Sequence, residues 1–189
     1  MVSGDLAAGV TARYILRAGA GQLMDAILSA PAGASLSVTT LNGKALAPKT
    51  GSSIGFRGYL PHTGDYILTV KAGSQAVSYF LNVSIPARIA FQPGTTSASL
   101  NGQLQAHQSL DYILRARAEQ ILEINVSPEN SVQLIIYGVD GTVLRSGMGE
   151  GSSFRGLLPV SQDYIVTVRA GDQPVAFTLN AIIPQRITF

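Results

Sequence analysis

Histidine is the first residue type to consider for chemistry, because many hydrolases need a nucleophile that is activated by a neighbouring base. The chain has two histidines, His62 and His107. They fall at different positions of an internal repeat, since His62 aligns with Val160 and His107 aligns with Gly9. A duplicated catalytic histidine is therefore excluded, and we expect both side chains to be exposed in loops. The sequence predicts that the protein is not an enzyme.

The acidic residues are scattered as well, and one pair recurs in both copies of the repeat. Asp65 and Asp163 form this pair, and each is close in sequence to the arginine of a Phe-Arg-Gly segment, Arg57 or Arg155. We expect structural Asp–Arg pairing across neighbouring strands rather than acid/base catalysis or calcium binding. The sequence has no Asp/Glu cluster with ligand spacing, and it has no cysteine, so no metal and no cofactor are predicted.

Two further arginine pairs recur, and we interpret them as shared edge or inter-domain contacts. They are Arg17 with Arg115 and Arg88 with Arg186. An alternative is a saccharide-binding surface, in which arginine binds hydroxyls or carboxylates and a tyrosine supplies a stacking face. The candidate tyrosines are Tyr59, Tyr79 and Tyr137. Because the chain has no tryptophan, such a surface would be poor, and binding of an extracellular polysaccharide stays an alternative.

The composition predicts a folded domain with a large core and few charges. The chain is 46% hydrophobic and 13% charged, against roughly 25% charged residues in an average soluble protein. Thirteen Lys and Arg oppose eleven Asp and Glu, so nucleic acid is not an expected partner. The longest apolar stretches, such as 79–86, are much shorter than the roughly 20 residues of a membrane helix, so no membrane insertion is expected.

The chain is an internal duplication. Residues Val2–Phe91 align with Leu100–Phe189 without a gap, and roughly two in five of the aligned pairs are identical. Within each copy, short segments rich in β-branched and aromatic residues follow a period of two, as in 65–72 and 77–85. Turn signals separate them, among them Asn42-Gly43 and its counterpart Asp140-Gly141. We therefore predict an all-β fold of two tandem antiparallel jelly-roll-like β-sandwiches, each of about 90–98 residues.

One repeated motif predicts a specific structural contact. Leu60-Pro61 is followed by Tyr66, and Leu158-Pro159 by Tyr164, so each tyrosine begins a strand just after a proline-bearing turn. This is the arrangement of a tyrosine corner, in which the hydroxyl bonds to the backbone a few residues upstream. The alternative is an exposed tyrosine that stacks on a ligand.

The repeat does not begin and end in the same register. Segment 87–91 lies between the copies and is interpreted as the first strand of the second, while 185–189 repeats it with no further copy after it. We therefore assign 1–86 to a first repeat that lacks its own first strand, 87–184 to a second repeat, and 185–189 to an extra strand. The residues of this strand predicted to act in assembly are Arg186, Ile187 and Phe189.

Three explanations of the extra strand remain open. The chain is an excised part of a longer array, in which 185–189 begins a third domain. Alternatively, 185–189 completes the first repeat of the next molecule and builds a head-to-tail fibre. The third explanation is closure within the chain or in a swapped dimer. In each case an unpaired apolar edge favours association, because its N–H and C=O groups need partners.

The repeated motifs resemble a known bacterial domain. The order Tyr-x-Leu-x-Ala-x-x-Gly-Gln at 14–22, an Asn-Gly turn, Leu-Pro-x-Thr-Gly-Asp-Tyr-x-Leu-x-Val at 60–70 and Leu-x-Val-x-Ile at 81–85 is similar to the pre-peptidase C-terminal domain. It also resembles the related periplasmic inhibitors of goose-type lysozyme. The second copy departs from the pattern at Glu119 and Gln162, where the family has glycine.

The resemblance implies a secreted or cell-surface β-sandwich with a binding or structural role. The inhibitors carry a Ser-Gly-x-Tyr loop, which would map onto Thr63, Gly64 and Tyr66 in the first copy and onto Ser161 and Tyr164 in the second. Neither copy matches this loop fully, and the longer basic loop that follows it in the inhibitors is missing.

We therefore expect an extracellular or cell-surface module with a structural role, acting as a spacer, an adhesin stalk or a fibre subunit whose main partner is another copy of itself. Carbohydrate or cell-wall binding is the first alternative. Inhibition of a lysozyme or protease is the second.

Overall fold

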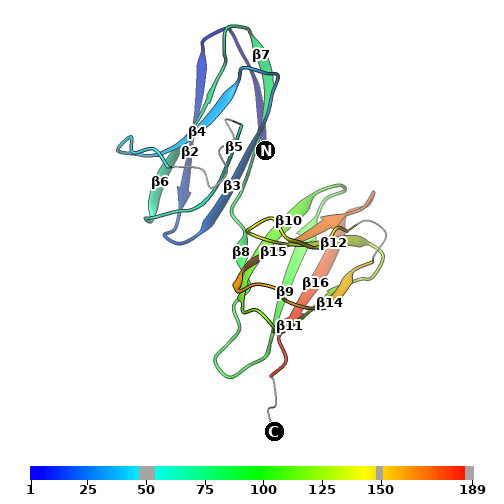
Figure 1. The fold of residues 1–189 in the computed structure, drawn as a ribbon. Helices are drawn as coiled ribbons and strands as arrows, with labels where there is room; N and C mark the ends of the chain where they lie inside the picture. The colour runs from blue at the N-terminus through cyan, green and yellow to red at the C-terminus, as the bar shows by residue number, and fades with distance from the viewer. Residues whose placement is uncertain (47–53, 148–150, 186–189) are drawn as a thin grey trace. The chain divides into compact units, whose positions relative to one another are not determined.

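The computed structural model describes residues 1–46, 54–147 and 151–185. These residues form sixteen strands, and the chain divides into two compact units, Met1–Ile85 and Pro86–Phe189 (Figure 1). Among the described residues no helix is long and apolar enough to cross a membrane. The predicted all-β fold with antiparallel sandwiches is confirmed.

The described part of the first unit has seven strands in two sheets. One sheet has the order β1-β7-β3-β5 and the other has the order β2-β6-β4. The pairing is antiparallel throughout both sheets. The strands are β1 (Val2–Leu6), β2 (Thr11–Ala18), β3 (Leu23–Ser29), β4 (Ser35–Thr40), β5 (Gly55–Tyr59), β6 (Gly64–Lys71) and β7 (Val77–Ser84).

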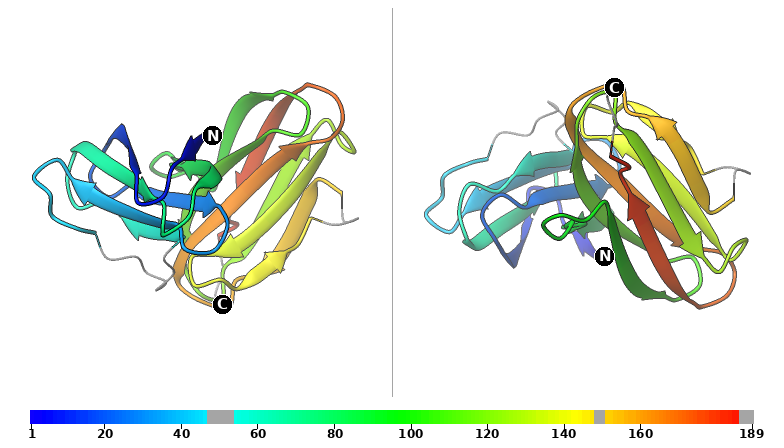
Figure 2. Two further views of the ribbon diagram at one scale, coloured as in Figure 1. Left: turned by 90° about the horizontal axis from the view of Figure 1, so that it is seen from above. Right: turned by 90° about the horizontal axis from the view of Figure 1, so that it is seen from below.

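The second unit repeats this plan and adds strands. One sheet has the order β14-β11-β16-β9 and the other has the order β13-β12-β15-β10-β8. Figure 2 shows its strands in two layers with the turns at their ends. The strands are β8 (Ala87–Arg88), β9 (Ser97–Leu104), β10 (Ser109–Ala116), β11 (Ile121–Ser127), β12 (Val132–Gly138), β13 (Val143–Arg145), β14 (Ser153–Leu157), β15 (Gln162–Ala170) and β16 (Val175–Ile182).

Alternation along the strands places one core between the two sheets of each unit. In β3, for example, Met24, Ala26 and Leu28 are buried while Ile27 and Ser29 between and after them are exposed. Each core is dominated by aliphatic side chains from both sheets, and the two cores use largely equivalent positions of the repeat. The period of two in the sequence therefore sets which residues are buried.

Tight turns join the strands where the sequence predicts them. Gly43 has φ 80° and its counterpart Gly141 has φ 94°, a backbone conformation that residues with a Cβ rarely adopt. The N–H of Gly43 donates to the carbonyl oxygen of Thr40, and that of Gly141 to the carbonyl oxygen of Gly138, both at 2.9 Å. These glycines let the chain reverse between β4 and the segment after it, and between β12 and β13.

Candidate functional site

In the second unit, β10 is paired along its outer edge with the short parallel strand β8. β8 pairs with Tyr112 and Ile113, and the N–H of Ile89 donates to the carbonyl oxygen of Ile113 at 2.8 Å. The Ile89 side chain is 3% exposed and belongs to the core of this unit, and Phe91 packs against the same core. The arriving strand therefore completes both the sheet and the core of the second unit.

In the first unit, the equivalent strand β2 is the last strand of its sheet, and among the described residues no strand pairs with its outer edge. Its inward side chains Tyr14 and Leu16 are only half-buried. The counterparts Tyr112 and Leu114 are 7% and 0% exposed. Within the described residues, the first core thus lacks the apolar side chains that β8 and the residues after it bring to the second core.

In each unit, an aspartate on the strand that pairs with β2 or β10 forms an ion pair with an arginine. In the second unit, Nη1 and Nη2 of Arg88 lie 3.3 and 3.5 Å from Oδ1 and Oδ2 of Asp163. Asp65 holds the same position in the first unit, where its Oδ1 is 3.3 Å from Nη1 of Arg17. The Arg17 side chain is 75% exposed and that of Asp65 is 34% exposed. Of the recurring arginines, Arg88 lies on the edge strand β8 and Arg17 on the edge strand β2, whereas Arg115 lies on β10 inside its sheet and Arg186 is outside the described residues.

The predicted pairing of these aspartates with the arginines of the Phe-Arg-Gly segments is wrong. Arg57 instead bonds through Nε to Oδ2 of Asp25 at 2.9 Å, and Arg155 bonds through Nε to Oε1 of Glu123 at 2.8 Å. The reason is topological. β5 and β14, which carry these arginines, pair with β3 and β11, whereas Asp65 lies on β6 in the opposite sheet.

The two repeated tyrosines form tyrosine corners, as predicted. The Tyr66 hydroxyl donates to the carbonyl oxygen of His62 at 2.5 Å, and the Tyr164 hydroxyl donates to that of Val160 at 2.6 Å. The two side chains are 1% and 0% exposed. Each hydroxyl therefore closes the turn before its strand, and neither ring is exposed for stacking on a ligand.

The remaining residues of the inhibitor-like loop also make internal bonds. The Thr63 hydroxyl accepts a hydrogen bond from the N–H of Ala20 at 3.0 Å. The Ser161 hydroxyl accepts one from the N–H of Ala118 at 2.8 Å. Gly64 begins β6. The loop residues thus tie the turn after β2 or β10 to the turn before β6 or β15, and an inhibitory role for them stays a prediction.

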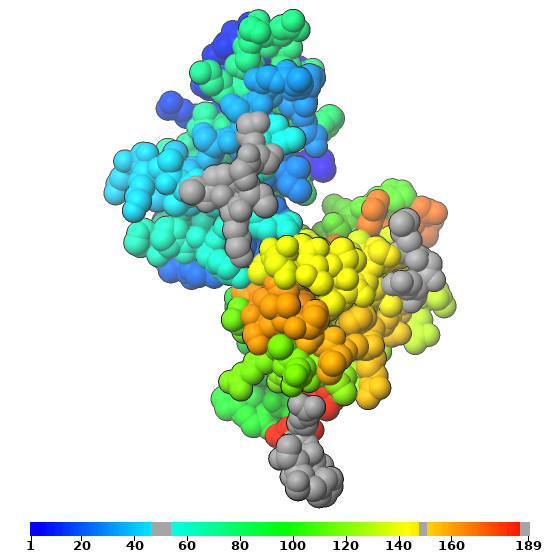
Figure 3. All heavy atoms as spheres, in the orientation of Figure 1, coloured from blue at the N-terminus to red at the C-terminus, as the bar shows by residue number. Residues whose placement is uncertain are grey.

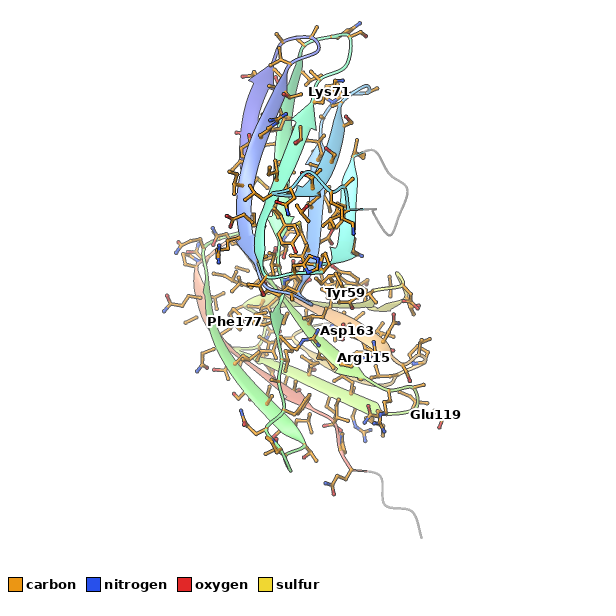
Figure 4. The ribbon with its side chains drawn as sticks, turned by 90° about the vertical axis from the view of Figure 1, so that its left-hand side faces the viewer. Tyr59, Lys71, Arg115, Glu119, Asp163 and Phe177 are labelled. Atoms are coloured by element: carbon orange, nitrogen blue, oxygen red, sulfur yellow. The ribbon has the colours of Figure 1, made fainter. Side chains whose placement is uncertain are left out.

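Two positions at which the second copy departs from glycine have structural consequences. Glu119 has φ 64° where Gly21 has φ 75°, so a residue with a Cβ occupies a left-handed position (Figure 4 labels Glu119). Gln162 accepts a hydrogen bond from the N–H of Asp140 at 3.2 Å through Oε1. The hydrogen bond that the backbone N–H of Thr142 donates to the Asp140 carboxylate lowers the pKa of Asp140. Gln162 therefore supports the turn between β12 and β13.

A groove of about 1300 Å³ lies at one end of the second unit. Its walls come from the turn 116–120, from Leu157 at the end of β14, and from residues 183–185. Figure 3 shows these parts of the chain in lime, orange and red. Arg115 and Ser161 also line it. The sequence provided no signal for this groove, because its walls come from segments that are far apart along the chain.

The three tyrosines considered for saccharide binding differ in burial and are distributed over both units. Tyr79 is 3% exposed, and its hydroxyl is 2.5 Å from that of Tyr14. Burial, and then this hydrogen bond, raise the pKa of Tyr79 to about 12. Tyr59 is 41% exposed and lies on β5 of the first unit, whereas Tyr137 lies on β12 of the second. Tyr79 is thus a core residue and cannot supply a stacking face.

Both histidines are exposed, as predicted. His107 lies 3.8 Å from the carboxylate of Asp172 through Nδ1, and both side chains are largely exposed. Within the described residues no group of three or more His, Asp or Glu side chains is placed to hold a metal ion. The predicted assembly residues Arg186, Ile187 and Phe189 lie outside the described residues.

The chain was compared with known proteins. No family model matches it, so the resemblance to the pre-peptidase C-terminal domain stays a prediction. No curated protein matches it either. Similar solved structures are β-sandwich proteins described as periplasmic inhibitors of g-type lysozyme. The one from Aeromonas hydrophila is 19% identical, with a TM-score of 0.46, over 52% of this chain and 96% of its own. The one from Salmonella Typhimurium is 16% identical, with a TM-score of 0.42, over 52% of this chain and 97% of its own.

Proposed function

We propose that this chain is a non-catalytic, extracellular or cell-surface module that assembles with further copies of itself by strand addition. In this assembly, residues 185–189 of one copy pair in parallel with the outer edge of β2 in the first unit of the next copy. The second unit supports the geometry, because its own strand β8 adds to β10 in this way.

The observation that carries the proposal is the difference in burial between the two copies. Tyr14 and Leu16 are partly exposed, whereas the equivalent Tyr112 and Leu114 beside β8 are buried. Residues 185–189 repeat 87–91, with arginine, isoleucine and phenylalanine at the same positions. Ile187 and Phe189 would therefore fill the places that Ile89 fills and Phe91 borders in the second core. Burial of this apolar surface and pairing of the free N–H and C=O groups would drive assembly.

The test is the assembly state of the full chain across concentration, by light scattering after size exclusion and then by electron microscopy. Ile187→Lys with Phe189→Lys should abolish assembly, because two charges would face the core. The matched control is Gln185→Lys with Thr188→Lys, which adds the same charge. The counterparts of these two positions, Ala87 and Ala90, are exposed, so the control should still assemble. A wild-type chain that stays monomeric at all concentrations would refute the proposal.

Inhibition of a lysozyme is a second candidate, which the resemblance implies. The position of Ser161 favours the second unit over the first for this role, because this loop residue lines the groove there. Titration of a goose-type lysozyme with the full chain measures it directly. Replacement of Ser161 by alanine, with folding checked by circular dichroism, then tests the loop.

A further inference from the structure

Asp65 of the first unit occupies the position that binds an incoming arginine in the second unit. In the second unit, Asp163 receives the guanidinium of Arg88 through two nitrogens, at 3.3 and 3.5 Å. Arg88 arrives on β8, the strand that is added to the edge of β10. Asp65 is the repeat equivalent of Asp163 and is the second residue of β6, which pairs with β2 in the same register as β15 pairs with β10. The carboxylate that meets an incoming arginine is therefore present in both units.

In the first unit, this carboxylate is held by an arginine of the edge strand itself. Arg17 lies directly across from Asp65 in the pairing of β2 with β6, and one nitrogen of its guanidinium contacts one carboxylate oxygen at 3.3 Å. With the Arg17 side chain 75% exposed, this ion pair is screened by water and contributes little to stability. Its counterpart Arg115 is likewise opposite Asp163 in register, yet there the strand β8 supplies the arginine seen on Asp163 (Figure 4 labels Arg115 and Asp163).

We propose that Asp65 selects the strand that adds to β2, by exchanging the guanidinium of Arg17 for that of Arg186 from a second copy. This inference rests on the proposed function. Arg17 holds the carboxylate in the free chain and leaves it when the strand arrives. The exchange replaces an exposed contact by a guanidinium that approaches both carboxylate oxygens, the fork geometry in which arginine binds carboxylates well. The site therefore recognises a short β-strand with arginine followed by two apolar residues at alternate positions.

This arrangement makes selection depend on charge as well as on apolar contact. A strand with the same apolar residues but without the arginine would fill the core and leave Asp65 with Arg17. A strand with an acidic residue at that position would face Asp65 directly, and the two like charges would repel each other. The preference for arginine should also weaken as salt is added, because the partners lie near the surface.

The inference is tested with peptides on a full-length acceptor that does not assemble. The acceptor is the Ile187→Lys, Phe189→Lys chain, and the probe is a peptide with the sequence of residues 184–189, titrated by calorimetry. Arg186→Gln in the peptide should weaken binding roughly tenfold, the loss expected for one charge-assisted contact. Asp65→Asn in the acceptor should weaken binding of the original peptide by a similar factor. The two changes together should cost no more than one alone, because they remove the same contact.

Arg17→Gln changes the affinity for the peptide in opposite directions under the two interpretations. An ion pair that only stabilises the fold would leave or weaken peptide binding when it is removed. Removal of the internal competitor should tighten binding of the original peptide severalfold and leave binding of the Arg186→Gln peptide unchanged. Equal affinities of the original and Arg186→Gln peptides would overturn the selection by Asp65 while the proposed assembly stands. If no peptide binds even to the acceptor with Asp65 and Arg17 intact, strand addition itself fails. The peptide variants need no change in the protein, so this comparison holds even if Asp65→Asn does not fold.

Discussion

Truncation of Leu16 to alanine should cost less folding free energy than truncation of Leu114, although the two leucines occupy the same position of the repeat. Leu114 is 0% exposed, and its core includes Ile89, which directly follows β8. A fully buried Leu→Ala change costs about 3 kcal/mol, through lost transfer free energy and the cavity left behind. Leu16 is partly exposed, so a smaller cost of about 2 kcal/mol is expected for it.

The measurement is unfolding in urea with hydrogen exchange as the probe. The free energy of unfolding is obtained for each unit from the peptides that belong to it. The background is the non-assembling Ile187→Lys, Phe189→Lys chain. Leu60 and Leu158 form the matched control pair, because they are 1% and 0% exposed. Their alanine variants should cost about the same in the two units. Equal costs for Leu16 and Leu114 would refute the reasoning, since they would mean that the open edge of β2 leaves the core no less packed.

The same comparison links stability to assembly. In the wild-type chain at assembling concentrations, the added strand should bury Leu16 as β8 buries its counterpart. The cost of Leu16→Ala should then rise toward that of Leu114→Ala, because the variant loses assembly contacts as well as folding contacts. A cost that does not change with concentration would argue against burial of this side chain by a second copy.

Three further changes test single contacts by denaturation. The pKa of Tyr79 is raised to about 12, so the folded state binds this proton more tightly than the unfolded chain. The free energy of unfolding should therefore fall as the pH rises from 10 toward 12, and Tyr79→Phe should reduce that fall. An unchanged pH profile in Tyr79→Phe would contradict the assignment. Tyr66→Phe removes the bond to the carbonyl oxygen of His62 and should destabilise the first unit by about 1–2 kcal/mol; a neutral effect would show that the corner adds nothing. Glu119→Gly relieves a left-handed residue and should stabilise the second unit by up to about 1 kcal/mol; a loss of stability would show that the side chain contributes more than the left-handed backbone costs.

Local patterns in the sequence were sufficient to predict the sandwiches and the tyrosine corners. Alternation of apolar residues determines which side of a strand faces the core, and a turn glycine or a Leu-Pro-x-x-x-x-Tyr motif acts over a few residues. The contact between the Tyr66 hydroxyl and the carbonyl oxygen of His62 spans four residues, so the spacing alone predicts it. These features depend on interactions within one strand and its adjoining turn.

The ion pairs could not be predicted in this way. Asp65 and Arg57 are close in sequence, yet β5 and β6 belong to opposite sheets, so Arg57 bonds to Asp25 across β3 and β5. The partner of a side chain in a sandwich depends on which strands are neighbours, and paired strands such as β3 and β5 are not consecutive along the chain. The groove at the end of the second unit depends on the same long-range order.

The sequence by itself determined the duplication, the strand pattern and the recurrence of 87–91 at 185–189. Only the tertiary structure decided that 87–91 adds to β10 in parallel and brings Ile89 into the core, and that Leu16 remains half-buried beside β2. Two copies with nearly the same local pattern thus differ in burial. The physical reason is that burial depends on which strand lies alongside, and a neighbouring strand is a property of the fold rather than of the residues it covers.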